Sequence, residues 1–197
     1  MAIGEPVTIA ALGDSLTAGY GLPAGAGLVP QLQAWLGTRG HDVVLLNAGV
    51  SGDTTAGGRA RLDWTLTPDV DALIVELGGN DLLRGIDPAA SRANLDAILQ
   101  GATARGLPVL LVGLSAPRNY GPEFKTEFDT MYPELAAHYG ALLFANFFQP
   151  LITGRTQADL EADLQADGIH PNAGGVIKIV QGLGPAVEAL LERVATP

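Results

Sequence analysis

The first apolar run of the chain ends in the stretch VTIAALGDS, residues 7–15. The part up to Leu12 predicts a buried strand, because a short continuous apolar segment bounded by glycine is typical of one. A strand that ends in Gly13-Asp14-Ser15 places a hydroxyl group at its carboxyl end, where open α/β sheets bind their ligands. Ser15 is therefore a candidate nucleophile, provided that a base and hydrogen-bond donors reach the same edge.

Length and composition narrow the classes of protein. The 197 residues, 47% of them hydrophobic, fit one folded domain, which we place at residues 1–197. A net charge of -10 argues against a nucleic-acid partner, since that binding depends on Lys and Arg. The absence of cysteine excludes disulfides and thiolate chemistry. We expect no transmembrane segment, because no apolar run approaches the ~18–20 residues of a membrane helix. The N-terminus shows no signal-peptide pattern, although the mature form of an exported protein would look the same.

Strand-like apolar runs alternate with segments of helical period along the chain. Strands are predicted at residues 7–12, 43–47, 72–77, 108–114 and 141–145, and the main helices at 28–39, 87–105, 124–135 and 175–194. Proline predicts a kink or break at Pro133, and residues 182–185 predict an interruption of the last helix. This alternation with continuous apolar strands predicts a parallel sheet covered by helices on both faces.

Polar residues follow two further predicted strands at their carboxyl ends. Asn80, within GGND at residues 78–81, carries an amide NH₂ that can donate to a developing oxyanion. Gly52 could supply a backbone N–H to the same point. An ordinary turn is the alternative for residues 78–81. For residues 49–58 the alternative is a flexible loop or a phosphate-binding turn, although the chain has no nucleotide-binding glycine motif there.

The three histidines separate by their place relative to the strands. His41 and His138 precede predicted strands and therefore belong to the opposite edge, whereas His170 follows the last strand. Within DGIHPN, residues 167–172, His170 could accept a hydroxyl proton while Asp167 fixes its tautomer. The alternative is a helix-entry turn with Asp167 as the cap.

Two competing sites have weaker patterns. Ser115 lies in GLSAP, residues 113–117, which nearly matches the G-x-S-x-G elbow, but proline replaces the second glycine. Asp163, Asp167 and His170 could be imagined as metal ligands, but only one well-placed histidine is available.

Four blocks taken together resemble the SGNH, or GDSL, hydrolase superfamily. The closest resemblance is to its bacterial thioesterase I, lysophospholipase L1 and arylesterase group. The blocks are GDSLTAGY at residues 13–20, NAGVSGDT at 47–54, VELGGNDLLRG at 75–85 and DGIHPN at 167–172. Any one block is weak evidence, but all four in order, each at a predicted strand end, are specific. The resemblance covers nearly the whole chain.

The resemblance implies a fold and a set of catalytic residues. The fold is a three-layer α/β/α sandwich of the flavodoxin-like type with a five-stranded parallel sheet. Ser15 would be the nucleophile, His170 the base and Asp167 its orienting acid. The oxyanion hole would consist of the backbone N–H groups of Ser15 and Gly52 and the side chain of Asn80. No cofactor and no metal are expected.

Substrate-binding residues are expected in two segments. Apolar side chains near the site suggest a groove for an aliphatic or aryl acyl group, with core packing as the alternative for each: Leu82, Leu83, Ile86 and Tyr120. The resemblance also implies that the loop from Asp81 to Ile86 moves when an acyl chain binds. It further implies an acyl groove shaped by Ala116, Pro117, Asn119 and Tyr120.

The expected reaction is acyl transfer to water from a small-molecule ester or thioester with an apolar acyl group. Aryl esters, acyl thioesters and lysophospholipids are the candidate substrates. Carbohydrate O-deacetylation on the same scaffold is an alternative, although the apolar loop after Asn80 counts against it. A non-catalytic binding domain is a second alternative, but such a domain usually lacks one of the four polar site residues. The family implies a periplasmic or secreted location; a cytoplasmic location and the oligomeric state stay open.

Overall fold

Five parallel strands form the centre of the computed structural model, which describes residues 5–194. Their order is β2-β1-β3-β4-β5. The strands are β1 (Val7–Gly13), β2 (Val43–Gly49), β3 (Ala72–Glu76), β4 (Val109–Val112) and β5 (Leu142–Phe144). The order reverses direction beside β1, and such a switch point is where open α/β sheets form their ligand crevice. The two ends of the expected domain, residues 1–4 and 195–197, lie outside the described residues.

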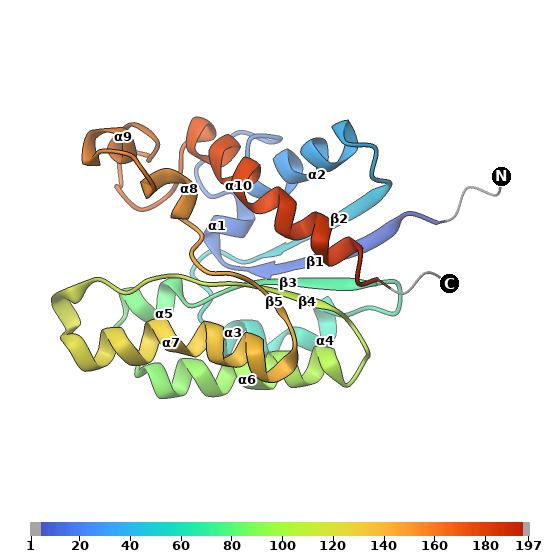
Figure 1. Ribbon diagram of the computed structural model, residues 1–197, viewed down its shortest axis with the longest axis horizontal. Coiled ribbons are helices and arrows are strands. Elements are labelled where there is room, and N and C mark those ends of the chain that lie inside the picture. Colours follow the sequence, from blue (N-terminus) through green and yellow to red (C-terminus); the bar gives the residue numbers. More distant parts are fainter. Residues whose placement is uncertain (1–4, 195–197) are drawn as a thin grey trace.

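Helices cover both faces of the sheet (Figure 1). One layer contains α1 (Ser15–Ala18), α2 (Leu28–Thr38), α8 (Gln149–Ile152), α9 (Gln157–Ala162) and α10 (Ala173–Leu191). The other contains α3 (Thr55–Ala60), α4 (Leu62–Thr65), α5 (Gly79–Leu83), α6 (Pro88–Thr103) and α7 (Pro122–Tyr139). A short 3₁₀ turn, η1 (Arg118–Tyr120), precedes α7. The predicted three-layer α/β/α sandwich is confirmed.

The central strands are buried on both faces, as parallel strands between two helical layers must be. Every residue of β3 and β4 is buried. Helix α10 presents Ile179, Leu183, Val187 and Leu190 to the same core. By length and composition alone, α10 is also the one helix among residues 5–194 that could cross a membrane, but this is weak evidence, because a helix packed in a core passes the same test.

Two predicted helix breaks, at Pro133 and at residues 182–185, are wrong. Helix α7 runs through Pro133 without a break. It buries Phe128 and Met131 before the proline and Leu135 after it, so packing offsets the lost hydrogen bond. Helix α10 likewise continues through residues 182–185.

The glycines of α10 serve close packing instead of ending the helix. A Cβ atom on Gly184 would lie 2.6 Å from the ring of Trp35 in α2. One on Gly182 would lie 2.4 Å from Pro150 in α8. Neighbouring helices therefore approach α10 closely only because side chains are missing at these two positions.

Candidate active site

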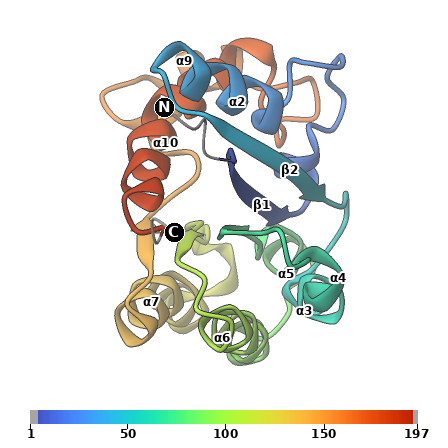
Figure 2. The ribbon, with the colours of Figure 1, turned by 90° about the vertical axis from the view of Figure 1, so that its right-hand side faces the viewer.

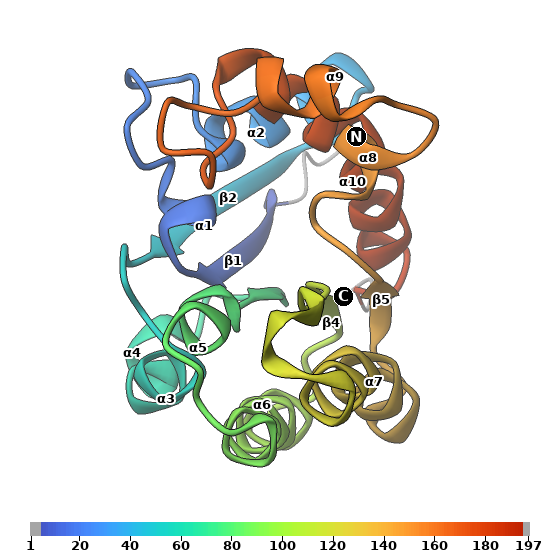
Figure 3. The ribbon, with the colours of Figure 1, turned by 90° about the vertical axis from the view of Figure 1, so that its left-hand side faces the viewer.

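The turn after β1 leads directly into α1 at the carboxyl edge of the sheet (Figure 3). Ser15 is the first residue of α1. Strand β1 passes into α1 almost at once, and this needs glycine at position 13, because a Cβ atom there would lie 2.0 Å from the Thr17 hydroxyl oxygen. Asp14 caps α1, its carboxylate accepting the Leu16 N–H at 2.9 Å. Ser15 is thus the first residue of the helix, at the switch point of the sheet.

Ser15, His170 and Asp167 form a hydrogen-bonded line. His170 Nε2 lies 2.8 Å from Ser15 Oγ, and His170 Nδ1 lies 2.7 Å from Asp167 Oδ2. Asp167 Oδ1 accepts the backbone N–H groups of His170 at 3.0 Å and Ile169 at 2.9 Å. These two N–H groups, with the imidazole, hold the pKa of the Asp167 carboxyl at about 2. The carboxylate is therefore ionised at neutral pH, and it can orient the imidazole and stabilise its protonated form.

Gln165, which lies outside the four sequence blocks, holds the histidine loop in place together with Tyr20. Gln165 N–H donates to the His170 carbonyl at 2.7 Å, and Gln165 Nε2 donates to the Tyr20 carbonyl at 2.8 Å. The Tyr20 ring lies 4.7 Å from the imidazole between centroids. The loop that carries the base is thus fastened to the segment that follows the nucleophile. Sequence reasoning missed Gln165, which lies in a polar stretch without a motif.

Three hydrogen-bond donors are found at Ser15 and on the segments that follow the two neighbouring strands. Within residues 5–194, the backbone N–H groups of Ser15 and Gly52 donate to no protein acceptor. Asn80 Nδ2 donates one hydrogen to Asp14 Oδ2 at 3.1 Å, which leaves its second hydrogen available. Gly52 follows β2 and Asn80 follows β3, the two strands that flank β1. This placement brings the predicted oxyanion-hole residues to the two sides of the nucleophile.

Two carboxyl groups are buried beneath this site. Asp14 is 2% exposed and Glu76 is 1% exposed. Burial raises the pKa of both, and the Asp14 charge raises that of Glu76 further. Asp14 accepts two N–H groups, whereas Glu76 Oε2 accepts the Thr17 hydroxyl and Oε1 has no partner. Burial acts more strongly on Glu76, so the neutral, protonated form is favoured more at Glu76 than at Asp14.

A pocket of about 130 Å³ opens beside Ser15. Its walls are mainly apolar side chains from separate segments of the chain: Leu16, Leu82, Leu83, Leu114, Phe148 and Ile169. Two of these, Leu82 and Leu83, are predicted substrate-binding residues. The other four are not predicted to bind substrate: Leu16, Leu114 and Ile169 lie within motifs chosen for their polar residues, and Phe148 lies outside every motif.

A family model described as the GDSL-like lipase/acylhydrolase family matches residues 11–176. The chain belongs to this family. Esterase TesA of Pseudomonas aeruginosa is 39% identical over 185 residues, which are 93% of this chain and 89% of the relative. The thioesterase 1/protease 1/lysophospholipase L1 of Escherichia coli K12 is 37% identical over 167 residues, covering 84% and 76%.

Solved structures of family members share this architecture. The crystal structure of TesA superposes with a TM-score of 0.83 at 38% identity, covering 93% of this chain and 99% of that one. The SGNH-hydrolase family esterase AlinE4 gives a TM-score of 0.78 at 44% identity, covering 96% and 99%. The esterase EstA from Pseudoalteromonas sp., in a structure inhibited by monoethylphosphonate, gives 0.84 at 32% identity, covering 94% and 98%.

Asp81 does not face the pocket of this GDSL family member, contrary to the expectation that it contacts substrate. Its side chain is 1% exposed, and its carboxylate accepts the Thr55 N–H at 2.8 Å and the Ser91 hydroxyl at 2.9 Å. Asp81 therefore ties α5 to α3 and α6. Ala116 is also buried, packed in the core.

The remaining predicted groove residues also lie outside the pocket lining. They are Ile86, Pro117, Asn119 and Tyr120. Tyr120 stacks on Phe124 at 4.8 Å between centroids and lines a separate hollow with Gly85. Through this stacking the segment after β4 packs against α7, which contains Phe124.

Ser115 reaches the pocket wall but has no base. Its hydroxyl lies 3.0 Å from Lys125 Nζ and 3.1 Å from Asp129. Lys125 is itself paired with Asp129 at 2.6 Å, and no histidine contacts the Ser115 hydroxyl within the described residues. Asp163, the imagined metal ligand, is bonded to Arg155 and Lys178 instead.

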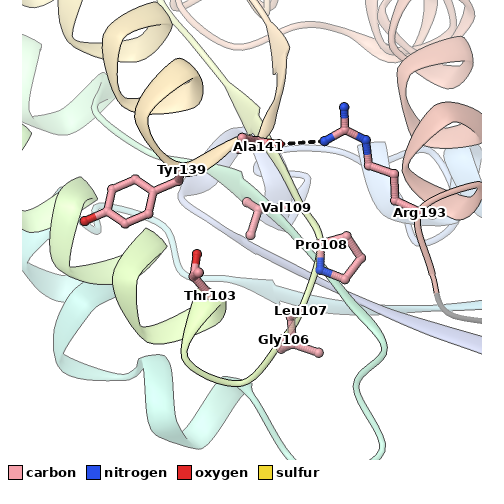
Figure 4. Close-up of a pocket in the computed structure, with 9 residues that line it drawn as sticks. Thr103, Gly106, Leu107, Pro108, Val109, Tyr139, Ala141 and Arg193 are labelled. Carbon is pink, nitrogen blue, oxygen red and sulfur yellow. Dashed lines mark hydrogen bonds between the residues drawn. The ribbon is translucent and has the colours of Figure 1, made fainter.

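A second hollow, of about 230 Å³, lies at the opposite, amino-terminal edge of the sheet (Figure 4). Figure 2 views the molecule from the side of this edge. Thr103, Tyr139 and Arg193 line it, and the Arg193 guanidinium donates to the Gly140 carbonyl at 2.6 Å. No nucleophile–base pair faces this hollow within the described residues. The candidate catalytic residues therefore lie at the carboxyl edge of the sheet, around Ser15.

Proposed function

We propose that this protein is a serine esterase that hydrolyses small carboxylic esters through an acyl-enzyme on Ser15. The observation that supports this most is the unbroken hydrogen-bonded line from the Ser15 hydroxyl through the His170 ring to the Asp167 carboxylate. Such a line activates a hydroxyl that is otherwise a weak nucleophile.

The reaction proceeds in two acyl transfers. Ser15 Oγ attacks the ester carbonyl while His170 Nε2 takes the hydroxyl proton. The oxyanion is stabilised by the N–H groups of Ser15 and Gly52 and by the Asn80 amide; losing one such donor costs about 2.7–4 kcal/mol. The alcohol leaves with the proton from His170, and water, deprotonated by the same ring, then releases the acid and regenerates Ser15.

The pocket suggests the acyl group. Its walls are leucine, phenylalanine and isoleucine side chains, so an apolar acyl chain fits them. Its volume of about 130 Å³ is below the roughly 300 Å³ at which drug-sized sites begin, which favours short acyl chains. Aryl esters are the first substrates to test, since a relative from Vibrio mimicus is named arylesterase. Thioesters and lysophospholipids are the next.

The small pocket also admits an acetyl group, which keeps carbohydrate O-deacetylation as a second candidate. A series of p-nitrophenyl esters of increasing chain length separates the two. Activity that peaks at acetate and extends to acetylated sugars would favour the carbohydrate substrate. A peak at butyrate or longer would favour aliphatic and aryl esters.

The nucleophile is tested by Ser15→Ala. We expect this variant to lose p-nitrophenyl butyrate turnover and covalent labelling by a fluorophosphonate. Ser115→Ala is the matched control, because it removes another serine of the pocket wall, and labelling should persist. Turnover and labelling of Ser15→Ala at wild-type levels would refute the proposal.

A further inference from the structure

Two of the proposed oxyanion donors lie on elements that the sheet alone does not hold together. Gly52 is the third residue of an exposed turn, closed by a hydrogen bond from Asp53 N–H to the Val50 carbonyl at 3.0 Å. It has a φ of 86°, the left-handed conformation that glycine adopts readily. Asn80 lies in α5, after a different strand. Both must face the same oxygen atom for catalysis.

Arg84 joins these two elements. Its Nη2 donates to the Gly52 carbonyl at 2.7 Å, and its backbone N–H donates to the Asn80 carbonyl at 3.1 Å. A Cβ atom placed on Gly52 would lie 3.7 Å from Nη2, so the guanidinium lies directly against the turn. One residue thus contacts the backbone of both donor residues.

The contacts of Arg61 show what Arg84 adds. Arg61 lies beneath the turn and donates to the Gly13 carbonyl at 2.9 Å, the Ala48 carbonyl at 2.7 Å and Asp53 Oδ2 at 2.6 Å. It holds the base of the turn to β1 and β2. Arg84 reaches the tip, at the residue that carries the donor, and links it to α5.

The Arg84 side chain makes no other hydrogen bond within residues 5–194. It is exposed, and it forms no ion pair with a carboxylate of residues 5–194. Its guanidinium therefore contributes little to the core and is not part of a surface salt bridge.

We infer that Arg84 is a positioning residue of the oxyanion hole, holding the Gly52 N–H in register with the Asn80 amide. This inference rests on the proposed esterase function. Since a misplacement of about 1 Å can cost about 100-fold in rate, removal of the guanidinium should lower kcat about 10- to 100-fold. KM for a neutral ester should change less than about threefold, because the donors act mainly on the transition state.

The test compares Arg84→Met and Arg84→Lys with the wild-type protein, using p-nitrophenyl butyrate. Methionine keeps the unbranched stem without donors, whereas lysine can still donate to the Gly52 carbonyl, so lysine should recover part of the lost kcat. Millimolar guanidinium chloride, far below denaturing concentrations, should raise kcat of Arg84→Met and leave wild type unchanged. The unfolding temperature should shift by less than about 3 °C, because the side chain is exposed.

Arg118→Met is the matched control. Arg118 also follows a strand at this edge, in η1, and its side chain makes no hydrogen bond or ion pair within the described residues. If loss of positive charge alone mattered, this variant would lose as much kcat as Arg84→Met.

Three results would overturn the inference. The first is wild-type kcat in Arg84→Met, and the second is an equal loss in Arg118→Met. The third is a rise in KM confined to anionic esters with kcat unchanged, which would mean that Arg84 binds the substrate directly. A wild-type protein that neither hydrolyses esters nor reacts with a fluorophosphonate would instead refute the proposed function.

Discussion

Replacing Asp167 by asparagine should disable the base through its tautomer. Asp167 Oδ1 accepts two backbone N–H groups, from Ile169 and His170, and the amide oxygen of asparagine must take this place. The amide NH₂ is then forced against His170 Nδ1, where the carboxylate now lies at 2.7 Å. The ring nitrogen must accept that hydrogen bond, so the imidazole proton moves to Nε2. A protonated Nε2 cannot take the Ser15 proton.

The expected loss of kcat is about 10⁴-fold, or about 5.5 kcal/mol in the barrier, as for a wrong tautomer in other serine hydrolases. The hydrogen bonds around position 167 determine which way the asparagine amide is oriented. Both backbone donors belong to the histidine loop itself, so the asparagine cannot rotate its oxygen towards the ring without leaving two N–H groups unpaired.

The assay is steady-state hydrolysis of p-nitrophenyl butyrate together with the rate of fluorophosphonate labelling, both of which need the activated serine. Circular dichroism checks that the variant is folded. Asp159→Asn is the control. Asp159 also has a lowered pKa, but it forms a capping box with Thr156 at the start of α9 and contacts no catalytic residue. A folded Asp167→Asn variant within tenfold of wild type would show that the carboxylate does not set the tautomer.

Three further predictions concern the buried carboxyl pair and the pocket. Asp14→Asn can accept from only one of Leu16 N–H and Asn80 Nδ2, so kcat should fall about 100-fold in ester hydrolysis; unchanged kcat would contradict the role of Asp14 in holding Asn80. Burial raises the pKa of Glu76, so the native state keeps a proton that the unfolded state releases, and stability falls as pH rises above Glu's ordinary value. The free energy of unfolding, measured with urea at each pH from 5 to 8, should fall less steeply with pH in Glu76→Gln than in wild type. The two dependences should differ by at most about 1.4 kcal/mol per pH unit, and an equal dependence on pH would contradict this. Phe148→Ala should move the chain-length optimum of p-nitrophenyl esters to longer acyl groups, and an unmoved optimum would mean that Phe148 does not bound the pocket.

The parts of the site that could be predicted are those fixed by strand ends. In a parallel sheet every strand delivers its next residues to one edge, so Ser15 after β1 and Asn80 after β3 meet whatever the details of packing. His170 could be chosen over His41 and His138 by the same rule. The topology does this sorting, and short-range sequence signals are enough to recover the topology.

Apart from Leu82 and Leu83, the pocket walls could not be predicted, because their residues look like core residues. Leu114, Phe148 and Ile169 are apolar residues in a chain that is 47% hydrophobic, and no local pattern separates a wall from an interior position. Asp81 is the opposite case: it is predicted to contact substrate, but its side chain is buried away from the pocket. It stands beside Asn80 at the correct edge, but Thr55 and Ser91, from two other helices, take up its carboxylate. Long-range packing of this kind has no signal in one sequence.

Glu76 shows a kind of sequence signal that could have been used. It ends β3, whose sequence is ALIVE, and all five residues are buried. A carboxyl group in a fully buried strand is costly unless it is neutralised or paired, so its presence indicates a constraint other than packing. Here burial and the neighbouring Asp14 charge raise the pKa of Glu76, which favours its neutral form beside the residue that holds Asn80. A lone carboxyl residue in an apolar strand next to a candidate nucleophile therefore indicates a functional site independently of motif spacing.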